Sequence, residues 1–160
     1  MIVVSYGHDI PGSAKKGILT PAASSKRPGQ ARFQREQVKV RVFYFKRGQE
    51  VSMKYMVEGK TPTAEDFKTD YAQVQALKIK PDTDAAKDDI VLAERMFAMF
   101  NSDTVNPLGT PGGQQIIRSL DVGHTSMSMG DIVVIGETPF IVRGEGFEKL
   151  PFSVTPLQGL

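Results

Sequence analysis

Residues 38–46, Val-Lys-Val-Arg-Val-Phe-Tyr-Phe-Lys, are β-branched, aromatic and basic, in the alternating pattern of a strand. Successive side chains of a strand point to opposite faces, so the odd-numbered positions share one face. These positions are Lys39, Arg41, Phe43 and Phe45. Single-stranded nucleic acid needs cations along its phosphates and rings that stack on unpaired bases, and stacking contributes about 1–3 kcal/mol per base. The pattern therefore predicts a binding face for single-stranded DNA, which we call the aromatic face.

Further basic residues flank this strand in the sequence. They are Lys46, Arg47 and Lys54 on the C-terminal side, and Lys15, Lys16, Lys26, Arg27, Arg32 and Arg35 on the N-terminal side. We expect these side chains to contact phosphates and to give an affinity that falls with salt. A second interpretation stays open, in which the two Phe rings pack under a helix and the cations are ordinary surface charges.

The formal net charge of +2 is the balance of two opposed regions. Residues 1–60 contain 12 Lys and Arg against 4 Asp and Glu, whereas residues 61–160 contain 8 against 14. The regional net charges are therefore +8 and −6. This asymmetry favours a polyanion as the partner, or self-association into a homo-oligomer.

Candidate catalytic groups are sparse. His124 stands near Ser126 and Ser128, but a nucleophilic triad also needs an orienting acid and an oxyanion site, so a structural role for this His is favoured. The Gly-rich segment 109–114 lacks the Lys-Ser/Thr pair of a phosphate-binding loop. The chain has no Cys, which excludes thiol catalysis and Cys-based metal sites. We expect no enzyme activity, no metal and no cofactor.

Local patterns predict the elements that position these residues. Strands are expected at residues 2–6, 38–46, 51–57, 71–79, 131–135 and 140–143, and helical segments at 63–70, 84–100 and 114–120. The spacing in residues 71–79 fits a helix as well as a strand, and we favour the strand. Thr63 followed by Asp66 resembles a capping box. The apolar stripe and acidic start of residues 84–100 make this segment the clearest helix.

These elements divide the chain into three parts. Residues 1–37 read as a flexible, basic arm rich in Pro, Gly and Ser, and residues 38–150 as the folded domain. Residues 151–160 form an apolar tail that docks on its own domain or on a neighbouring subunit. The expected fold class is α+β, with a mostly antiparallel sheet and one principal helix. No signal peptide or membrane span is recognisable, so we expect a cytoplasmic protein in a bacterial host cell, with no membrane contact.

One segment carries a family resemblance. Residues 123–134, Gly-His-Thr-Ser-Met-Ser-Met-Gly-Asp-Ile-Val-Val, followed by Gly-Phe-Glu-Lys-Leu at 146–150, resemble the YodL-like family, with Gly130 where members usually have Ser. The helix that ends at Asn101 and the strand at 40–46 are similar to earlier elements of that family. The resemblance implies a small non-enzymatic accessory protein of phages or mobile elements. In size and overall profile the chain is also similar to small phage proteins that coat single-stranded DNA and recruit a phage RNA polymerase.

Two functions follow as expectations. The first is binding of single-stranded DNA without sequence specificity, as an oligomer, in phage transcription or replication. The alternative is a protein–protein inhibitor that docks on host machinery through the same sheet or the tail.

Overall fold

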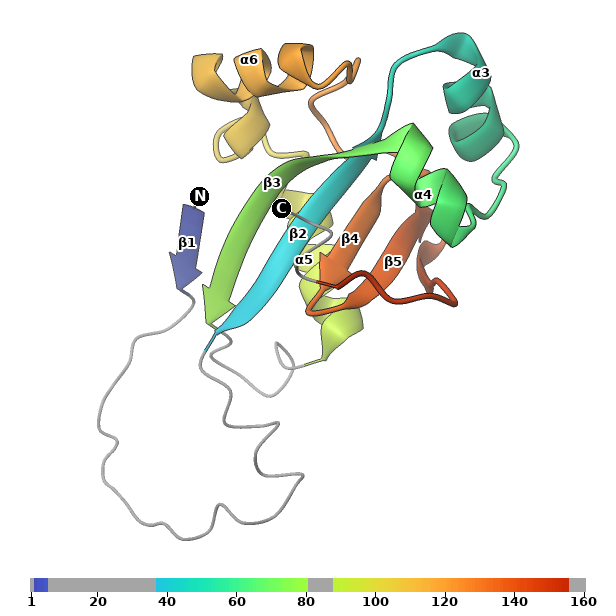
Figure 1. The fold of residues 1–160 in the computed structure, drawn as a ribbon. Coiled ribbons are helices and arrows are strands. Elements are labelled where there is room, and N and C mark those ends of the chain that lie inside the picture. The colour runs from blue at the N-terminus through green and yellow to red at the C-terminus, as the bar shows by residue number, and fades with distance from the viewer. Residues whose placement is uncertain (1, 6–36, 81–87, 156–160) are drawn as a thin grey trace, which may run out of the picture.

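The structure is a computed structural model that describes residues 2–5, 37–80 and 88–155 (Figure 1). Six strands form one sheet in the order β1-β3-β2-β4-β5-β6. Their bounds are Ile2–Ser5 (β1), Val38–Phe45 (β2), Tyr71–Lys80 (β3), Ile132–Ile135 (β4), Thr138–Arg143 (β5) and Gly146–Lys149 (β6). β1 pairs in parallel with β3, and the other neighbours are antiparallel. The expected α+β class with a mostly antiparallel sheet is confirmed.

The helices of the described residues lie between β2 and β4 in the sequence. They are α3 (Gln49–Ser52), the π-helix η2 (Met53–Val57), α4 (Ala64–Asp70), α5 (Asp89–Met99), the 3-10 helix η4 (Pro107–Gly109) and α6 (Pro111–Ser119). The helix predicted at 84–100 corresponds to α5, which Asp88 caps at its N-terminus. The described residues contain four α-helices, of which α5 is the longest, so the expectation of one principal helix is not confirmed.

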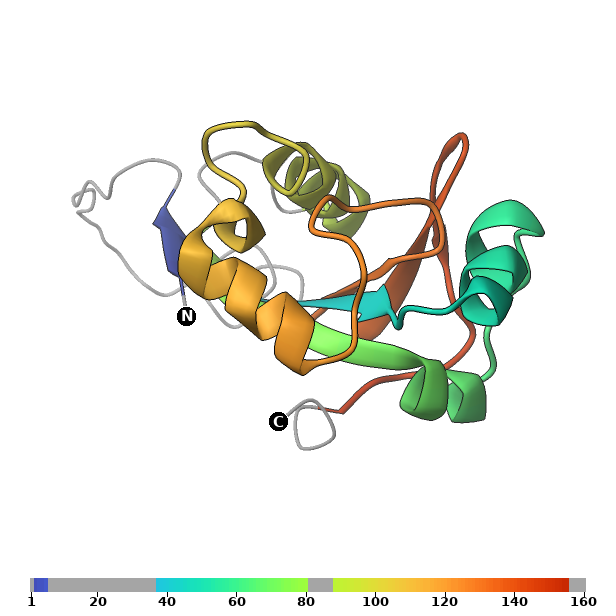
Figure 2. The same cartoon turned by 90° about the horizontal axis from the view of Figure 1, so that it is seen from above.

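Both faces of the sheet are covered by apolar contacts. On one face, Leu92 and Met96 of α5 and Ile117 of α6 pack against Val40 and Val42 of β2. On the other face, side chains from η2, α4 and the C-terminal segment pack together, among them Tyr55, Phe67, Leu150 and Val154. Figure 2 shows α5 on one side of the sheet and the C-terminal segment on the other. The strand at the centre therefore lies between two cores.

β2 is that central strand, and it is paired along both edges. β3 pairs with it from Val38 to Phe45, and β4 pairs from Val40 to Phe43. With both edges occupied, β2 has no edge left for the strand predicted at residues 51–57. That prediction is wrong: after Gly48, whose φ of 133° favours glycine, the chain enters α3 and η2 instead.

Several local predictions are confirmed. Thr63 and Asp66 form both hydrogen bonds of the capping box at the start of α4, each 3.0 Å long. The ambiguous segment at 71–79 is the strand β3, and the strands predicted at 131–135 and 140–143 are β4 and β5. The helix predicted at 114–120 begins earlier, at Pro111, because Thr110 caps it by accepting a hydrogen bond from Gly113 N. β6 was not predicted.

The C-terminal segment docks on its own domain. Leu150 and Val154 are each about 1 % exposed, and Val154 N donates to Glu137 O. The other expected route, docking on a neighbouring subunit, is therefore not needed to bury these residues; residues 156–160 lie outside the described part. Most of the predicted arm, residues 6–36, also lies outside it. No helix of the described residues is long and apolar enough to span a membrane.

Candidate functional site

The two rings of the aromatic face are buried. Phe43 is 6 % exposed and Phe45 is 4 % exposed, in the core that includes Tyr55 and Phe67. The Phe43 ring lies 4.7 Å from the Phe67 ring of α4, measured between centroids. The predicted stacking of these rings on bases is therefore wrong, and the interpretation that placed them under a helix is correct. The physical reason is that α4 and η2 cover this half of the sheet face.

Arg41 is also unavailable to a phosphate. The side chain is fully buried, and its guanidinium donates to the backbone oxygens of Gly136, Val154 and Thr155 at 2.7–2.9 Å. Buried charged groups need such partners, because an unpaired buried charge is costly. Arg41 therefore fastens the C-terminal segment to the sheet, and its predicted phosphate contact is wrong.

Three predicted cations, Lys46, Arg47 and Lys54, lie beyond the C-terminal end of β2, and two of them pair with carboxylates. Arg47 Nε lies 3.2 Å from Asp121 Oδ1, and Lys54 Nζ lies 3.4 Å from Asp70 Oδ2. Lys46 is half-buried, and its backbone N donates to Asp70 O. Exposed or partly exposed pairs of this kind contribute only about 0–1 kcal/mol to stability. They do, however, reduce the positive potential that a polyanion would meet.

The opposite end of β2 differs. Lys39 is half-buried and Lys78 is exposed, and the two residues are direct cross-strand partners on β2 and β3. Neither has an ion pair within the described residues. We call this corner of the sheet, with Lys80 two residues further along β3, the basic end. The six predicted arm residues, Lys15, Lys16, Lys26, Arg27, Arg32 and Arg35, lie outside the described residues.

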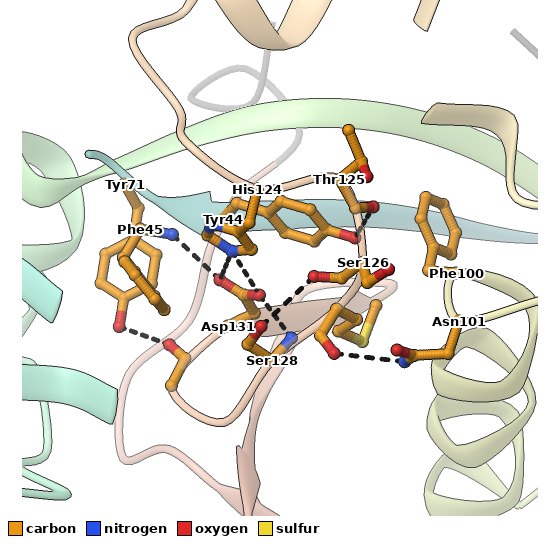
Figure 3. Close-up of polar contacts among 12 residues, drawn as sticks. Tyr44, Phe45, Tyr71, Phe100, Asn101, His124, Thr125, Ser126, Ser128 and Asp131 are labelled. Carbon is orange, nitrogen blue, oxygen red and sulfur yellow. Dashed lines mark hydrogen bonds and ion pairs between the residues drawn. The ribbon is translucent and has the colours of Figure 1, made fainter. Parts of the chain in front are cut away.

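A buried polar cluster near the C-terminal end of β2 escaped the sequence analysis. Asp131 is fully buried at the start of β4, and its carboxylate accepts hydrogen bonds from Phe45 N at 3.1 Å and Ser128 N at 2.7 Å. His124 Nε2 lies 2.8 Å from Asp131 Oδ2 (Figure 3). Burial raises the pKa of Asp131 to about 6, although the hydrogen bonds and charge of His124 act in the opposite direction.

The ring of His124 is held between two aromatic rings. It stacks on Tyr44 at a centroid distance of 4.6 Å and an interplanar angle of 7°, and it lies 4.6 Å from the Phe45 ring. Tyr44 Oη donates to Thr125 O, and Tyr71 Oη donates to Gly130 O, so both ends of the 123–131 loop are tied to the sheet (Figure 3). Gly130, with φ of 96°, adopts a conformation that a side chain would strain, and a Cβ added there would come within 2.9 Å of Tyr55 O.

The cluster contains an oriented acid–base pair, the Asp131 carboxylate and the His124 imidazole. No group of three or more His, Cys, Asp or Glu in the described residues could hold a metal ion. The sequence signal was present in part: a His and an Asp seven residues apart, on either side of a Ser-rich loop. Comparison with known proteins adds no assignment, because no family model, curated protein or solved structure matches this chain.

Proposed function

We propose that this protein binds single-stranded DNA through its phosphates, without sequence specificity and without catalysis. The observation that carries the proposal is the pairing of Lys39 with Lys78 at the basic end. Aromatic stacking by Phe43 and Phe45 is no part of it. Assembly into an oligomer, and a role in phage transcription or replication beside an RNA polymerase, stay predictions that accompany this proposal.

Repulsion between Lys39 and Lys78 at the basic end supports an anionic partner. Residues directly opposite each other on antiparallel strands have Cβ atoms about 4.5–5.5 Å apart, and like charges there are destabilising. Lys39 and Lys78 are such a pair, and neither has an ion pair within the described residues that would offset the repulsion. A phosphate placed between the two ammonium groups would turn this repulsion into attraction.

The connectivity of the sheet places both flanks of a basic segment at the same corner. β1 ends at Ser5, which pairs with Lys80, and β2 begins at Val38, which pairs with Ile79. Residues 6–36 join these two points and contain six Lys and Arg against two Asp and Glu. The chain thus tethers this basic segment at both ends beside Lys78 and Lys80. Tethering raises the effective concentration of its cations near any polyanion bound there.

A binding measurement with matched charge variants tests the proposal. A fluorescent single strand of about 30 nucleotides is titrated in about 0.05–0.2 M salt. Because two phosphate contacts are removed, we expect Lys39→Gln with Lys78→Gln to weaken binding about tenfold and to flatten the salt dependence by roughly 1.4 in slope. A duplex of the same length measures the preference for the single strand.

The control removes the same charge elsewhere. Lys60→Gln with Lys68→Gln changes two exposed lysines that pair with Glu58 and Glu65. An equal loss of affinity in both double variants would leave the basic end without a special role. Absence of binding to the single strand at about 0.1 M salt would contradict the proposal as a whole.

The alternative function, a protein–protein inhibitor, stays a prediction. It relied on the sheet face or the C-terminal tail as the docking surface. The aromatic face is covered by α4 and η2, and the described part of the tail packs on its own domain through Phe152 and Val154. Neither surface therefore favours the alternative over nucleic-acid binding.

A further inference from the structure

A cavity of about 270 Å³ opens beside His124, at the opposite end of β2 from the basic end. The residues that line it include Arg47, Ser52, His124 and Ser128, which have polar side chains, and the apolar Phe45 and Met56. Ligand sites typically combine an apolar wall with a few convergent polar groups in a volume of about 300 Å³ or more. This cavity has a similar lining but a volume just below that range, so its ligand would be a small molecule.

His124 Nε2 contacts the Asp131 carboxylate, and this contact determines whether the other ring nitrogen, Nδ1, is a hydrogen-bond donor or acceptor. Above about pH 6 the Asp131 carboxylate is ionised and accepts hydrogen bonds, so His124 Nε2 carries the proton that it donates. A neutral His124 therefore has its free lone pair on Nδ1, and a charged His124 has an N–H there. The orientation is fixed, because Tyr44 and Phe45 hold the ring.

His124 Nδ1 makes no hydrogen bond within the described residues, yet it is not sealed inside the protein. Among the described side chains that are not exposed, the buried nitrogen and oxygen atoms without a partner belong to Arg41 and Gln73. Nδ1 of His124 is not one of them, so this nitrogen keeps some exposure to solvent, and His124 is among the residues that line the cavity. The imidazole thus lies at the cavity with Nδ1 free to donate or accept a hydrogen bond, while its Nε2 contacts a buried carboxylate.

Arg47 supplies a fixed positive charge on the same cavity. Its backbone N donates to Asp121 O, and a Cβ added at Gly123 would come within 3.3 Å of Arg47 Cβ. The residue is therefore packed against the segment that leads into His124. Its guanidinium uses Nε for Asp121, which leaves N–H donors on the two terminal nitrogens. Arg47 and His124 are consequently held by one short stretch of chain.

We propose that this cavity binds a phosphate group, free or as a small monoester, between Arg47 and His124. Arg47 donates hydrogen bonds to two phosphate oxygens, as planar guanidinium groups do. His124 Nδ1 accepts a hydrogen bond from the P–OH of the monoanion, or donates one to the dianion when the ring is protonated. Phosphate has a second pKa of about 6, so the monoanion that carries the P–OH is present around that pH. A carboxylate or sulfate has no such hydroxyl at neutral pH.

The test follows the ring nitrogens of His124 by NMR in the full chain. Inorganic phosphate, phenyl phosphate and sulfate are titrated at constant ionic strength near about pH 6.5. We expect saturable shifts of the His124 signals with phosphate at a Kd near about 1 mM, and at least about tenfold weaker binding of sulfate. Tighter binding of phenyl phosphate would identify a monoester as the preferred source, and equal affinity would identify free phosphate.

Two variants and one control keep the result interpretable. Arg47→Gln should weaken phosphate binding by at least about tenfold without unfolding, because the Arg47 side chain is 55 % exposed. Arg118→Gln removes an exposed Arg on α6 outside the cavity and should leave binding unchanged. His124→Asn assigns the ring signals. The absence of saturable shifts, an equal response to sulfate, or equal effects of the two Arg variants would overturn the proposal. A variant that loses phosphate binding but keeps DNA binding, or loses DNA binding but keeps phosphate binding, distinguishes this cavity from the basic end.

Discussion

Basic side chains lie at both ends of β2, but their neighbours differ in charge. At the C-terminal end, Arg47 pairs with Asp121, Lys54 pairs with Asp70, and His124 contacts Asp131. At the N-terminal end, roughly 20 Å away along the strand, Lys39 faces Lys78 instead of a carboxylate. A basic residue in the sequence is therefore available to a partner only where the fold brings no acid to it.

The acids that make this difference come from one region of the chain. Asp70, Asp121 and Asp131 all belong to residues 61–160, the part with a net charge of −6. They reach the C-terminal end of β2 because α4 ends at Asp70, and because the loop after α6 returns to β2 and leads into β4. Some basic residues of the first region thus pair with acidic residues of the second region inside the domain.

The largest effect should follow from truncating the core at the C-terminal end. Phe45→Ala removes a buried ring that packs against His124 and should lower the free energy of unfolding by about 3–5 kcal/mol. Lys39→Gln, on the same strand at the basic end, should change it by less than about 0.5 kcal/mol. Urea denaturation of both variants measures the contrast. A loss below about 1 kcal/mol in Phe45→Ala would mean that this ring is not core.

The second effect is a pH dependence at Asp131. Burial raises its pKa to about 6, so the folded chain holds this proton more tightly than the unfolded chain does. The resulting stabilisation is complete below about pH 4 and is lost as the pH rises through about 6. Relative to Asp131→Asn, the wild-type free energy of unfolding should fall by roughly 3 kcal/mol over that range.

Urea denaturation of wild type and Asp131→Asn between about pH 3.5 and 7.5 measures this difference. Asp103→Asn, at an exposed position in the loop after α5, serves as the control and should track wild type at all pH values. A difference between wild type and Asp131→Asn that stays constant with pH would contradict the raised pKa.

The smallest effect has the opposite sign and belongs to the basic end. Lys78→Glu replaces a like-charged cross-strand pair with an attractive one, and it should raise the free energy of unfolding by about 0.2–1 kcal/mol. The same change should weaken binding of single-stranded DNA. Lys68→Glu, which removes the pair with Glu65 on α4, is the control and should lower stability by a few tenths of a kcal/mol. Destabilisation by Lys78→Glu would show that Lys39 and Lys78 do not repel each other.

Local sequence patterns predicted much of the secondary structure but not the environment of each face. The alternation in β2 correctly placed Phe43 and Phe45 opposite Val42 and Tyr44. It could not say what covered the odd-numbered face, because that depends on α4 and η2. A further signal was present in the unbroken apolar run 42–45, which is typical of a strand buried on both faces.

The candidate cavity was even less accessible from sequence. In the sequence, the segment with His124 and Asp131 shows only a His near two Ser, for which a structural role is favoured, and a family resemblance. Its chemistry depends on Phe45 N and on the ring of Tyr44, which come from a strand about 80 residues earlier. Only when the loop folds back onto β2 do the carboxylate, the imidazole and Arg47 meet.

The sequence by itself determined the α+β class, the capping box at Thr63, the alternation of β2 and the opposed charges of the two regions. These properties arise from neighbours along the chain, through side-chain direction, helix capping and composition. The tertiary structure decided which rings are buried, which cations meet an acid and where a lone imidazole nitrogen faces a cavity. Those outcomes depend on residues far apart in the chain being packed together, and burial then changes what the same side chain can do.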